Sequence, residues 1–535
     1  MTTSRRSFLK HVSLAPFSLW IPQAFAEATA TSLARSIPEA EDVAAAGILD
    51  FLDAIEREKF ELHSLMMLRH GKVIAEGWWK PYGPEFVHTM YSMSKSFTST
   101  AVGFAVAEGK LSVEDKVVSF FPDDLPEKVS DNLAAMRVKD LLTMSTGNEK
   151  EPTGVMVKEE NWARTFLAQN IAHKPGTQFM YNSAATYMCS AIVQRLTHQT
   201  VLDYLTPRLF APLGIQGMKW ETCPHGINTG GWGLSIQTEG MAKFGQFLLQ
   251  KGKWNGEQLL PAAWVEEATR FHIQQPGGDK PDRPKAKNDW MQGYGYQFWR
   301  CQGTGFRGDG AFGQFTIVLP EQDAVIVMTS ENKNMQGQLD LVWKHLLPAI
   351  DAKEPKVADL SKLRRLTLAP QQGCKTAPAT NGDTPFVIGT GVASGARFQL
   401  EANNLGIKMV SFVFRGSDGS CIFSADDQTI NCGMESWERR EATLPGTPPR
   451  LISGGMPKQP VPTKIAASAA WTDERTLVMQ WRYYETPHSD RVTCEFSGGN
   501  VTITFLNSIT AMNPKAKDAR APLKGKAVAH TIWHK

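Results

Sequence analysis

The decapeptide YSMSKSFTST, from Tyr91 to Thr100, places a serine three residues before a lysine. Residues three apart on a helix share one face, so Lys95 can reach Ser92 if this segment is helical. A lysine removed from water has a lowered pKa and can then take the proton of a serine hydroxyl, which makes the serine a nucleophile. Serine is also a common N-cap residue, and the decapeptide alone leaves both interpretations open.

The spacing Ser-x-x-Lys occurs three times in the chain, each time in different surroundings. Ser7 and Lys10 belong to an N-terminal segment that is typical of an export signal. Ser330 and Lys333 follow the apolar run AVIVMTS and enter a polar loop, where we expect both to lie at the surface. Ser92 precedes a segment of small and apolar residues that is typical of a buried helix, whose first N–H groups and dipole favour a developing negative charge.

A tyrosine in the segment FMYNSAATYMCSAIVQRL is a second candidate for proton transfer. Tyr181, Asn182 and Ser183 immediately precede a predicted amphipathic helix, which places a phenol and a hydroxyl at its entrance. A tyrosine in that position can take or relay a proton when nearby cations lower its pKa.

The glycine-rich segment FRGDGAFGQFTIVLP is a candidate for contact with a substrate backbone or carbonyl group. Gly308, Gly310 and Gly313 begin an apolar strand, and backbone without side chains permits close approach. The N–H groups of this segment could complete an oxyanion hole together with the amide of Ser92.

Strand-like and helical patterns between residues 45 and 350 must position these candidates. A helical period in GILDFLDAIER gives way to strand-like runs around LMMLRHGKVIAEGWW, with a hairpin turn at His70-Gly71. Helices are predicted before Gly109 and in VKDLLTMSTG, AATYMCSAIVQRLTHQ and EGMAKFGQFLLQKGKW, and QFTIVLPEQDAVIVMTS predicts a second hairpin. Strands at both ends of the region favour one mixed sheet of distant segments with helices on its faces.

The C-terminal part of the chain has a different pattern. LRRLTLAPQQGCKTAPATNGDTP is rich in Pro, Gly, Thr and Ala and predicts a linker. Beyond it, KMVSFVF, RTLVMQWRYY and NVTITFL lie between turn signals and predict a small all-β domain, either a barrel or a sandwich. Leu477, Met479, Trp481 and Tyr483 share one strand face, which we expect to be core rather than a ligand site.

In order and spacing these motifs resemble the serine β-lactamase and penicillin-binding-protein superfamily. Ser-x-x-Lys, then a Tyr motif, then a glycine-ended strand is its three-part signature. The connecting phrases VKDLLTMSTG, KPGTQFMYNSAATYM and GGWGLSIQTEGMAKFGQFLLQKGKWNGEQLLP are also similar to the family's intervening helices. The resemblance covers roughly residues 45 to 350 and is closest to the class C-related esterase-like and nylon-oligomer-hydrolase branch. It implies an α+β fold, with an antiparallel sheet flanked by helices and an all-helical region.

The resemblance also implies roles for individual residues. Ser92 would be the acylated nucleophile, Lys95 its base and Tyr181 the residue that passes the proton to the leaving group. Gly310 would close the strand motif, and the amides of Ser92 and Ala311 would hold the oxyanion. The reaction implied is acyl transfer in two steps, with an acyl-enzyme that water then hydrolyses.

The sequence departs from the family pattern at both later motifs. Ser183 occupies the third place of the Tyr motif, where an asparagine is common, and Asn182 stands one residue earlier. The strand reads Gly308-Asp309-Gly310, whereas lactam-binding relatives carry Lys or His first, a cation that recognises the substrate carboxylate. Its absence favours small esters or neutral amides as substrates, unless Arg307 substitutes for the missing cation.

Several alternatives remain at this level. A β-lactamase or D-alanyl peptidase would need the cation that Gly308 replaces, and a non-catalytic cell-wall binding or sensor protein could have lost Lys95 or Tyr181, which this chain retains. Trp232 in GGWG either lines the cleft with Asp309 or packs within a loop.

The first residues resemble a twin-arginine export signal. SRRSFLK precedes the short apolar run VSLAPFSLWI and then AFA at residues 24–26. That run is too short to span a bilayer, and no later segment is continuously apolar for such a length. We therefore expect a periplasmic or secreted protein that uses the twin-arginine machinery and has no integral membrane segment.

The predicted regions are residues 1–26 (signal), 27–355 (hydrolase domain), 356–385 (linker) and 386–535 (β domain).

Composition and motif searches exclude several other functions. The net charge of +3 without a basic block gives no footprint for nucleic acid. The 12 histidines form no H-E-x-x-H or H-x-H-x-D motif, and we expect His70, His88 and His173 to be isolated surface or packed residues. The histidine pattern therefore argues against a metallohydrolase, and no Walker or dinucleotide-binding motif is present, so we expect neither a metal nor a cofactor. The absence of a Gly-x-Ser-x-Gly motif disfavours an α/β-hydrolase. Among 7 cysteines, Cys421 and Cys432 could form a disulfide or remain two buried thiols.

Overall fold

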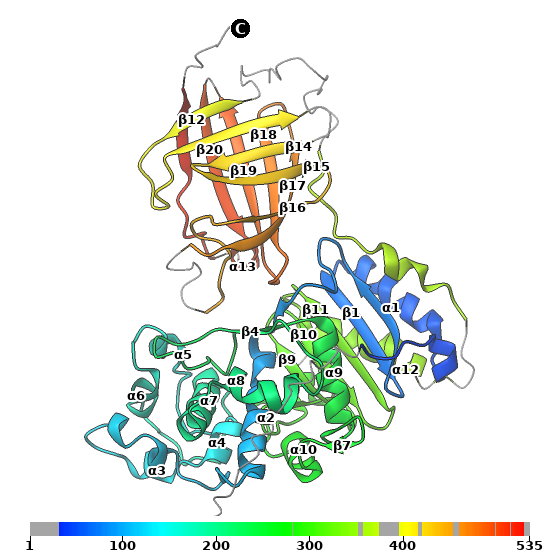
Figure 1. Cartoon of the computed structure of the whole chain (residues 1–535), viewed down its shortest axis with the longest axis vertical. Helices are drawn as coiled ribbons and strands as arrows, with labels where there is room; N and C mark the ends of the chain where they lie inside the picture. The colour runs from blue at the N-terminus through cyan, green and yellow to red at the C-terminus, as the bar shows by residue number, and fades with distance from the viewer. Residues whose placement is uncertain are drawn as a thin grey trace, which may run out of the picture.

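The computed structural model describes residues 32–280, 282–350, 352, 357–373, 395–415, 420–452, 460–497, 499–513 and 515–528. The predicted export signal at residues 1–26 lies outside these ranges, as do residue 356 and residues 374–385 of the predicted linker. Figure 1 shows a helix-and-sheet region below and an all-β region above it.

A six-stranded sheet forms one half of the N-terminal region (Figure 1). Its order is β2-β1-β11-β10-β9-β8, and each of these pairings is antiparallel, so the sheet is not mixed. The turn predicted at His70-Gly71 joins β1 to β2, and both residues have left-handed φ angles of 49° and 73°. The strands are β1 (Leu62–Arg69), β2 (Lys72–Trp78), β8 (Trp299–Arg300), β9 (Phe306–Gly310), β10 (Gln314–Leu319) and β11 (Ala324–Ser330).

Helices cover both faces of this sheet, which explains why its strands are continuous apolar runs. In β1, Leu65 and Met67 join the core under α1, whereas Met66 and Leu68 join the core that contains α9. The first face carries α1 (Ala45–Arg57), α11 (Met335–Leu341), η8 (Val342–Leu346) and α12 (Leu347–Ile350), and the second carries α9 (Thr238–Leu249).

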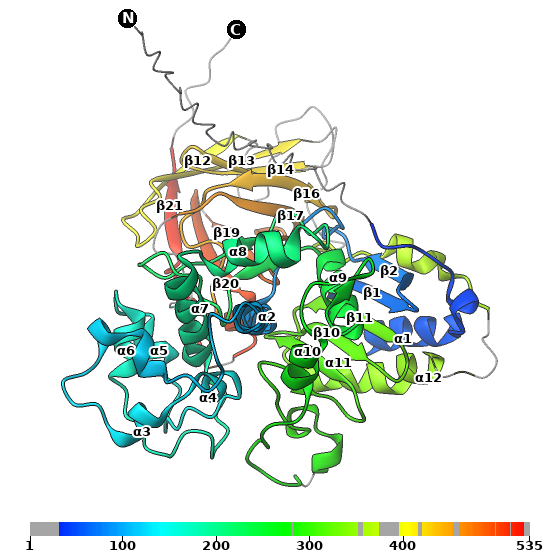
Figure 2. The same cartoon turned by 60° about the horizontal axis from the view of Figure 1, so that its bottom comes forward.

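The helical half is built around α2 (Ser94–Ala107), which lies between α7 (Ser183–Thr197) and β9 (Figure 2). Small residues allow α2 to be buried: a Cβ at Gly103 would lie 2.3 Å from the Trp264 indole nitrogen. The helix ends before Gly109, as predicted, with a φ of 68° at that glycine. The other helices of the helical half are α3 (Asp131–Ala135), α4 (Val138–Leu142), α5 (Thr153–Met156), α6 (Trp162–Leu167), α8 (Val201–Leu205), η5 (Thr206–Phe210) and α10 (Ala262–Thr269).

Short elements complete this region. They are η1 (Pro38–Glu41), η2 (Tyr91–Met93), η3 (Val117–Phe120), η4 (Pro122–Asp124), η6 (Lys285–Lys287) and η7 (Asp289–Met291), with the strands β3 (His88–Thr89), β4 (Lys219–Trp220), β5 (Leu234–Ile236), β6 (Lys253–Trp254) and β7 (Glu257–Gln258). β3, β5 and β4 form a small sheet next to η2.

The C-terminal region is a β-barrel, which resolves the choice between barrel and sandwich. Ten strands pair in the order β15-β14-β13-β12-β21-β20-β19-β18-β17-β16, and pairing of β15 with β17 closes the sheet on itself. The strands are β12 (Ala396–Leu400), β13 (Met409–Arg415), β14 (Ser420–Ala425), β15 (Gln428–Met434), β16 (Glu438–Ala442), β17 (Thr463–Trp471), β18 (Thr476–Tyr483), β19 (Ser489–Ser497), β20 (Asn500–Asn507) and β21 (Leu523–Ala527), with helix α13 (Ser508–Ala511) after β20.

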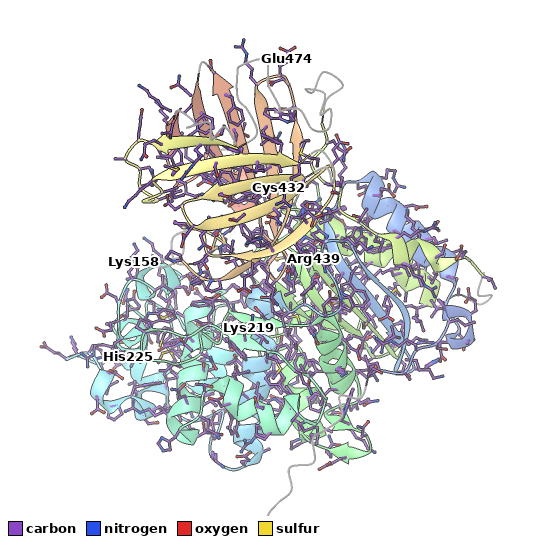
Figure 3. The ribbon with its side chains drawn as sticks, turned by 45° about the horizontal axis from the view of Figure 1, so that its top comes forward. Lys158, Lys219, His225, Cys432, Arg439 and Glu474 are labelled. Atoms are coloured by element: carbon purple, nitrogen blue, oxygen red, sulfur yellow. The ribbon has the colours of Figure 1, made fainter. Side chains whose placement is uncertain are left out.

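The barrel interior is apolar, as the alternation in β18 predicts. Leu477, Met479, Trp481 and Tyr483 are all buried in its core, which confirms the predicted core face. Cys421 and Cys432 lie opposite each other on β14 and β15 and are free, buried thiols. Figure 3 labels Cys432 on a barrel strand.

Part of the predicted linker packs on the N-terminal region. Helix η9 (Leu360–Arg365) places Leu363 against Gly77 of β2, and a bridge joins Lys80 to Thr367. The chain is therefore anchored at the sheet edge before it continues toward the barrel.

One end of the barrel contacts the N-terminal region. Arg482 donates two hydrogen bonds to Glu61, at 2.5 and 3.0 Å, and Arg439 donates to the Pro81 carbonyl at 2.7 Å. Figure 3 shows Arg439 at this boundary and Glu474 at the opposite end of the barrel.

Within the described ranges, none of the helices has the length and apolar character needed to cross a bilayer.

Candidate active site

Ser92 lies in the short helix η2, which leads directly into α2. The predicted reach of the lysine is confirmed, because Lys95 Nζ lies 3.1 Å from Ser92 Oγ. The N-cap position of α2 belongs to Met93, and no side chain caps it. Ser92 therefore does not serve as the N-cap of α2, and its hydroxyl faces the lysine instead.

Lys95 is held by three oxygen atoms in a buried site. Its side chain is only 1% exposed, and Nζ lies 3.1 Å from Ser92 Oγ, 3.0 Å from Ser183 Oγ and 2.8 Å from the Gly231 carbonyl oxygen. Burial lowers the pKa of Lys95 to about 7, against the opposing charges of Glu151 and Asp309. Near neutral pH a large share of the amine is therefore uncharged, and its lone pair can accept the proton of a neighbouring hydroxyl.

Tyr181 completes the cluster from the entrance of α7. The Tyr181 ring stacks on the Trp299 ring with centroids 5.4 Å apart. Lys95 Nζ lies 4.8 Å from the centroid of the Tyr181 ring. Burial raises the pKa of Tyr181, and its hydrogen bond with Ser92 opposes that shift only in part. The phenol thus remains protonated beside the nucleophile, where it can donate and then recover a proton.

The displaced asparagine of the Tyr motif has a structural role. Asn182 is the N-cap of α7: its side-chain oxygen accepts from Ala185 N at 3.0 Å, and its amide donates toward Thr146 and Asn148. Ser183 takes the position that faces the lysine, and its own N–H donates to Glu151 at 3.1 Å. The departure from the family pattern therefore replaces an amide by a hydroxyl at the lysine.

Strand β9 lies directly against the backbone that carries Ser92. A Cβ at Gly310 would lie 2.1 Å from the Met90 carbonyl oxygen, and one at Gly308 would lie 3.1 Å from Met93 Cγ. Glycine is needed at Gly310 because any side chain would collide with this backbone. This close packing places Ala311, the next residue, beside the turn that contains Ser92.

Arg307 and Asp309 form a buried ion pair on the other face of β9. Arg307 is 0% exposed, and its Nε donates to Asp309 Oδ2 at 3.0 Å. Its Nη1 donates to the carbonyl oxygens of Asp289 and Arg300 at 3.2 and 3.0 Å. Burial raises the pKa of Asp309 to about 6, although Arg307 opposes the shift. The guanidinium is thus neutralised within the protein and is not presented as a free cation.

Trp232 packs within the protein. It is 3% exposed, it stacks on Trp162 with centroids 5.7 Å apart, and its carbonyl accepts from Trp220 Nε1 at 2.9 Å. Of the two interpretations of the sequence, the structure favours the packed tryptophan. Its neighbour Gly231 supplies the carbonyl that holds Lys95.

One expectation from the sequence was wrong. Ser330 is 0% exposed rather than at the surface, because its hydroxyl lies 2.7 Å from the Phe312 carbonyl and 2.8 Å from the Gly313 carbonyl. His88 is a packed residue, as expected: it is 4% exposed, and its Nε2 lies 3.0 Å from Nδ1 of the buried His63. Lys333 is exposed, as expected.

Some contributors to the site had no signal in the sequence. The Gly231 carbonyl is a backbone group, and Glu151 lies in a polar loop without a recognisable motif. Trp299, which stacks on Tyr181, lies in a strand of two residues. Each of these becomes recognisable only when distant segments are brought together.

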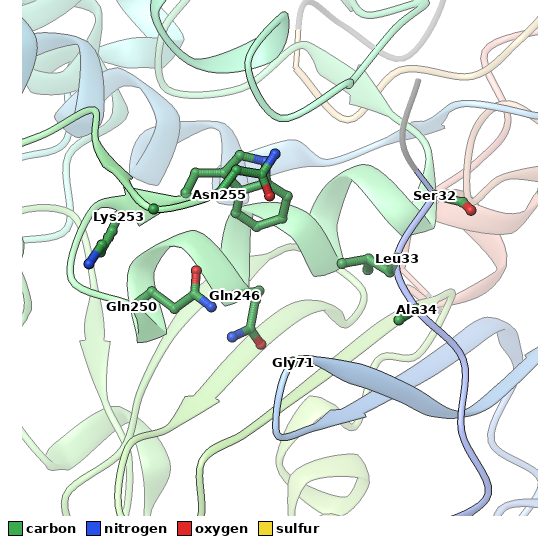
Figure 4. A pocket seen from close by; sticks show the side chains of 10 residues that line it. Ser32, Leu33, Ala34, Gly71, Gln246, Gln250, Lys253 and Asn255 are labelled. Carbon is green, nitrogen blue, oxygen red and sulfur yellow. The ribbon is translucent and has the colours of Figure 1, made fainter. Parts of the chain in front are cut away.

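A separate surface pocket lies away from this cluster (Figure 4). Figure 4 shows Gln246, Gln250 and Lys253 on one side of it and Ser32 and Ala34 on the other. Its lining includes none of the candidate site residues. Across the described residues, no group of three His, Cys, Asp or Glu side chains is placed to hold a metal ion.

Comparison with known proteins identifies the family. A family model described as "Beta-lactamase" matches residues 54–346, more than half of the chain. The chain belongs to the β-lactamase family, whose members include hydrolases that act through a serine.

Several known proteins and solved structures are similar to parts of this chain. The 6-aminohexanoate-dimer hydrolase of Paenarthrobacter ureafaciens is 25% identical over 286 residues, which cover 50% of this chain and 72% of that protein. A structure titled as a putative 6-aminohexanoate-dimer hydrolase from Bacillus anthracis has a TM-score of 0.49 at 17% identity and covers 60% of this chain and 87% of that one. The structure titled "EstCE1, a hydrolase with promiscuous acyltransferase activity" has a TM-score of 0.49 at 15% identity, with 59% and 100% of the two chains covered.

Proposed function

We propose that this protein is a serine hydrolase that cleaves small esters or neutral amides through an acyl-enzyme on Ser92. The observation that carries the proposal is the buried Lys95 amine, 3.1 Å from the Ser92 hydroxyl. Membership of the β-lactamase family supports the class of reaction, and the name of the 25% identical relative supports an amide or related acyl bond.

Acylation follows from the arrangement of the three side chains. Ser92 Oγ attacks the substrate carbonyl carbon while neutral Lys95 accepts its proton, and the carbonyl oxygen becomes an oxyanion that the amides of Ser92 and Ala311 stabilise. When the carbon–leaving-group bond breaks, Tyr181 donates its phenolic proton to the departing oxygen or nitrogen. The Lys95 ammonium then returns a proton to Tyr181, so the side chains regain their initial states.

Deacylation uses the same groups in the opposite direction. A water molecule takes the place of the leaving group near Tyr181 and attacks the acyl carbon, while Tyr181 accepts one proton of the water and passes its own proton to neutral Lys95. The bond to Ser92 Oγ then breaks, Ser92 recovers a proton, and the carboxylic acid product leaves.

The charges around the site favour neutral substrates. Gly308 provides no cation at the position where lactam-binding relatives have one, and Arg307 is paired with Asp309 at 3.0 Å and fully buried. A substrate carboxylate therefore lacks the Lys or His partner of those relatives. We expect short-chain nitrophenyl esters to be cleaved faster than nitrocefin, and faster nitrocefin cleavage would contradict this part of the proposal.

The proposed cellular setting is export through the twin-arginine pathway to the periplasm or beyond. The paired Arg5 and Arg6, followed by a short apolar run and AFA, support it. Replacement of both arginines by lysine should keep the protein in the cytoplasm of a bacterial host, and unchanged export would contradict this proposal.

The experiment that tests the reaction is intact-mass spectrometry after treatment with a fluorophosphonate probe. Wild type should gain one adduct that maps to Ser92, Ser92→Ala should gain none, and Ser330→Ala should retain the adduct. An adduct without turnover of any ester or amide would instead favour the binding or sensor protein. If a folded wild type forms no adduct, Ser92 is not an activated nucleophile and the proposal fails.

A further inference from the structure

The residues next to the two proposed oxyanion amides have an unusual backbone conformation. Tyr91, which precedes Ser92, has a φ of 47°, and Phe312, which follows Ala311, has a φ of 68°. A left-handed backbone is uncommon for residues other than glycine because Cβ approaches the carbonyl oxygen. Such residues persist where neighbouring groups hold them, and these two therefore require an external support.

That support comes from His488 in the hairpin between β18 and β19 of the barrel. Its Nε2 forms a hydrogen bond with the Tyr91 hydroxyl. Its ring meets both aromatic rings edge-on, with centroids 5.7 Å from Tyr91 and 5.1 Å from Phe312, which are themselves 5.6 Å apart. One barrel residue thus contacts the chain neighbours of both oxyanion amides.

His488 is itself held in one orientation. It is 1% exposed, and its Nδ1 lies 2.6 Å from Oε1 of the buried Glu331, to which Ser508 Oγ also donates at 2.5 Å. With Glu331 as a carboxylate, which only accepts hydrogen bonds, Nδ1 carries a proton, and in the neutral ring Nε2 then accepts from the Tyr91 hydroxyl. The hydrogen bonds that link Tyr91, His488 and Glu331 therefore run in one direction, from the Tyr91 hydroxyl as donor to the Glu331 carboxylate as acceptor.

The hairpin that carries His488 is fixed to the N-terminal region at several points. Thr89 N donates to the Glu485 carbonyl at 3.0 Å, and Tyr82 Oη donates to the Thr486 carbonyl at 3.2 Å. At the end of β18, the paired hydrogen bonds of Arg482 to Glu61 add a charged contact. These contacts, all from residues that precede His488 in the chain, fix the position of the hairpin relative to the N-terminal region.

We propose that the C-terminal barrel completes the active site, with His488 as a positioning residue that fixes the two amides of the oxyanion hole. This inference deepens the proposed function and rests on it. His488 touches no reacting atom: it holds Tyr91 and Phe312, and their backbones orient the N–H groups of Ser92 and Ala311.

If His488 only stabilised the contact between the two domains, a different result would be expected. In that case, loss of His488 would lower stability and leave the turnover of the remaining folded protein unchanged. A positioning role instead lowers kcat with little change in KM, because an oxyanion hole acts mainly on the transition state.

The test compares Tyr91→Phe and His488→Asn with a matched control at the same domain boundary, Arg439→Ala. Tyr91→Phe removes one hydroxyl and keeps the ring, and His488→Asn keeps a donor toward Glu331 while it removes Nε2 and the ring contacts. Both variants should lose about 10- to 100-fold in kcat for a neutral nitrophenyl ester, with KM within about twofold, since loss of a whole oxyanion donor costs about 10²–10³. A boronic acid that forms a tetrahedral adduct with serine should lose affinity in parallel. Arg439→Ala should stay within about twofold of wild type in both measurements.

The outcomes separate this inference from the function on which it rests. A separate sample of each variant is labelled with the fluorophosphonate probe, and the folding of the unlabelled variants used for kinetics is checked by circular dichroism. If wild type is labelled and the folded Tyr91→Phe and His488→Asn variants match Arg439→Ala in kcat and boronate affinity, His488 is not a positioning residue and only the inference fails. If wild type is not labelled at Ser92, the proposed function fails, and the inference falls with it.

Discussion

The turn at Ser92 and the turn at Ser330 share the spacing Ser-x-x-Lys and differ in almost every other respect. At the first turn, the lysine is buried and its amine lies 3.1 Å from the serine hydroxyl. At the second, the serine is buried against the Phe312 and Gly313 carbonyls, while Lys333 is exposed and donates to the Met512 carbonyl of the barrel at 2.9 Å. The same two residue types thus form a reactive pair in one place and two separate contacts in the other.

The difference has two physical causes. Ser92 and Lys95 lie on consecutive helical turns, where residues three apart share a face, but Ser330 ends strand β11 and the chain then leaves the sheet. Burial adds the second cause, because removal from water lowers the pKa of Lys95 to about 7 and leaves part of the amine neutral. A motif of this kind therefore acquires its chemistry from helical geometry and from burial of the lysine.

The largest expected effect on turnover comes from replacing each of the two serines by alanine. Ser92→Ala should reduce ester turnover by about 10³-fold or more, with an unchanged free energy of unfolding, because its hydroxyl supplies the nucleophile. Ser330→Ala should retain the Ser92 adduct but lose about 1–3 kcal/mol of stability, because a buried hydroxyl with several partners is removed. Ester kinetics and urea unfolding check both variants, and a large loss of stability in Ser92→Ala would reverse the comparison.

The two lysines give the next effect. Lys95→Met should lower kcat by about 10²–10⁴-fold, the usual range for loss of a general base. Lys333→Met should stay within about twofold of wild type, since it removes one exposed contact. Steady-state kinetics on the same ester provide the measurement, and equal losses in the two variants would contradict the account.

A smaller effect is expected at Tyr181, which assists the pair from α7. Tyr181→Phe keeps the ring that stacks on Trp299 and removes only the proton donor. We expect kcat to fall by about 10²-fold for esters with a poor leaving group and by less for nitrophenyl esters, whose leaving group needs little protonation. Equal losses for both kinds of ester would argue against proton donation to the leaving group.

Local features of the site were predictable from the sequence, and long-range ones were not. The helix that aligns Ser92 with Lys95, the entrance of α7 and the glycine strand β9 all follow from neighbouring residues. Burial of Ser330 was missed because its partners come from another turn, and the contact of Tyr91 with His488 joins residues 397 positions apart. Barrel closure likewise depends on pairing of β15 with β17, which no single strand encodes.

The most direct test of the central claim is the pH dependence of fluorophosphonate labelling of Ser92, measured by intact mass between about pH 5 and 9. Lys95 can accept a proton only when it is neutral, and its pKa is lowered to about 7. The labelling rate should therefore be low below this pH, rise through an apparent pKa near 7 and level off above it, and Lys95→Met should lose this transition. A rate that does not change across this range, or the same profile in Lys95→Met, would mean that Lys95 is not the base that activates Ser92.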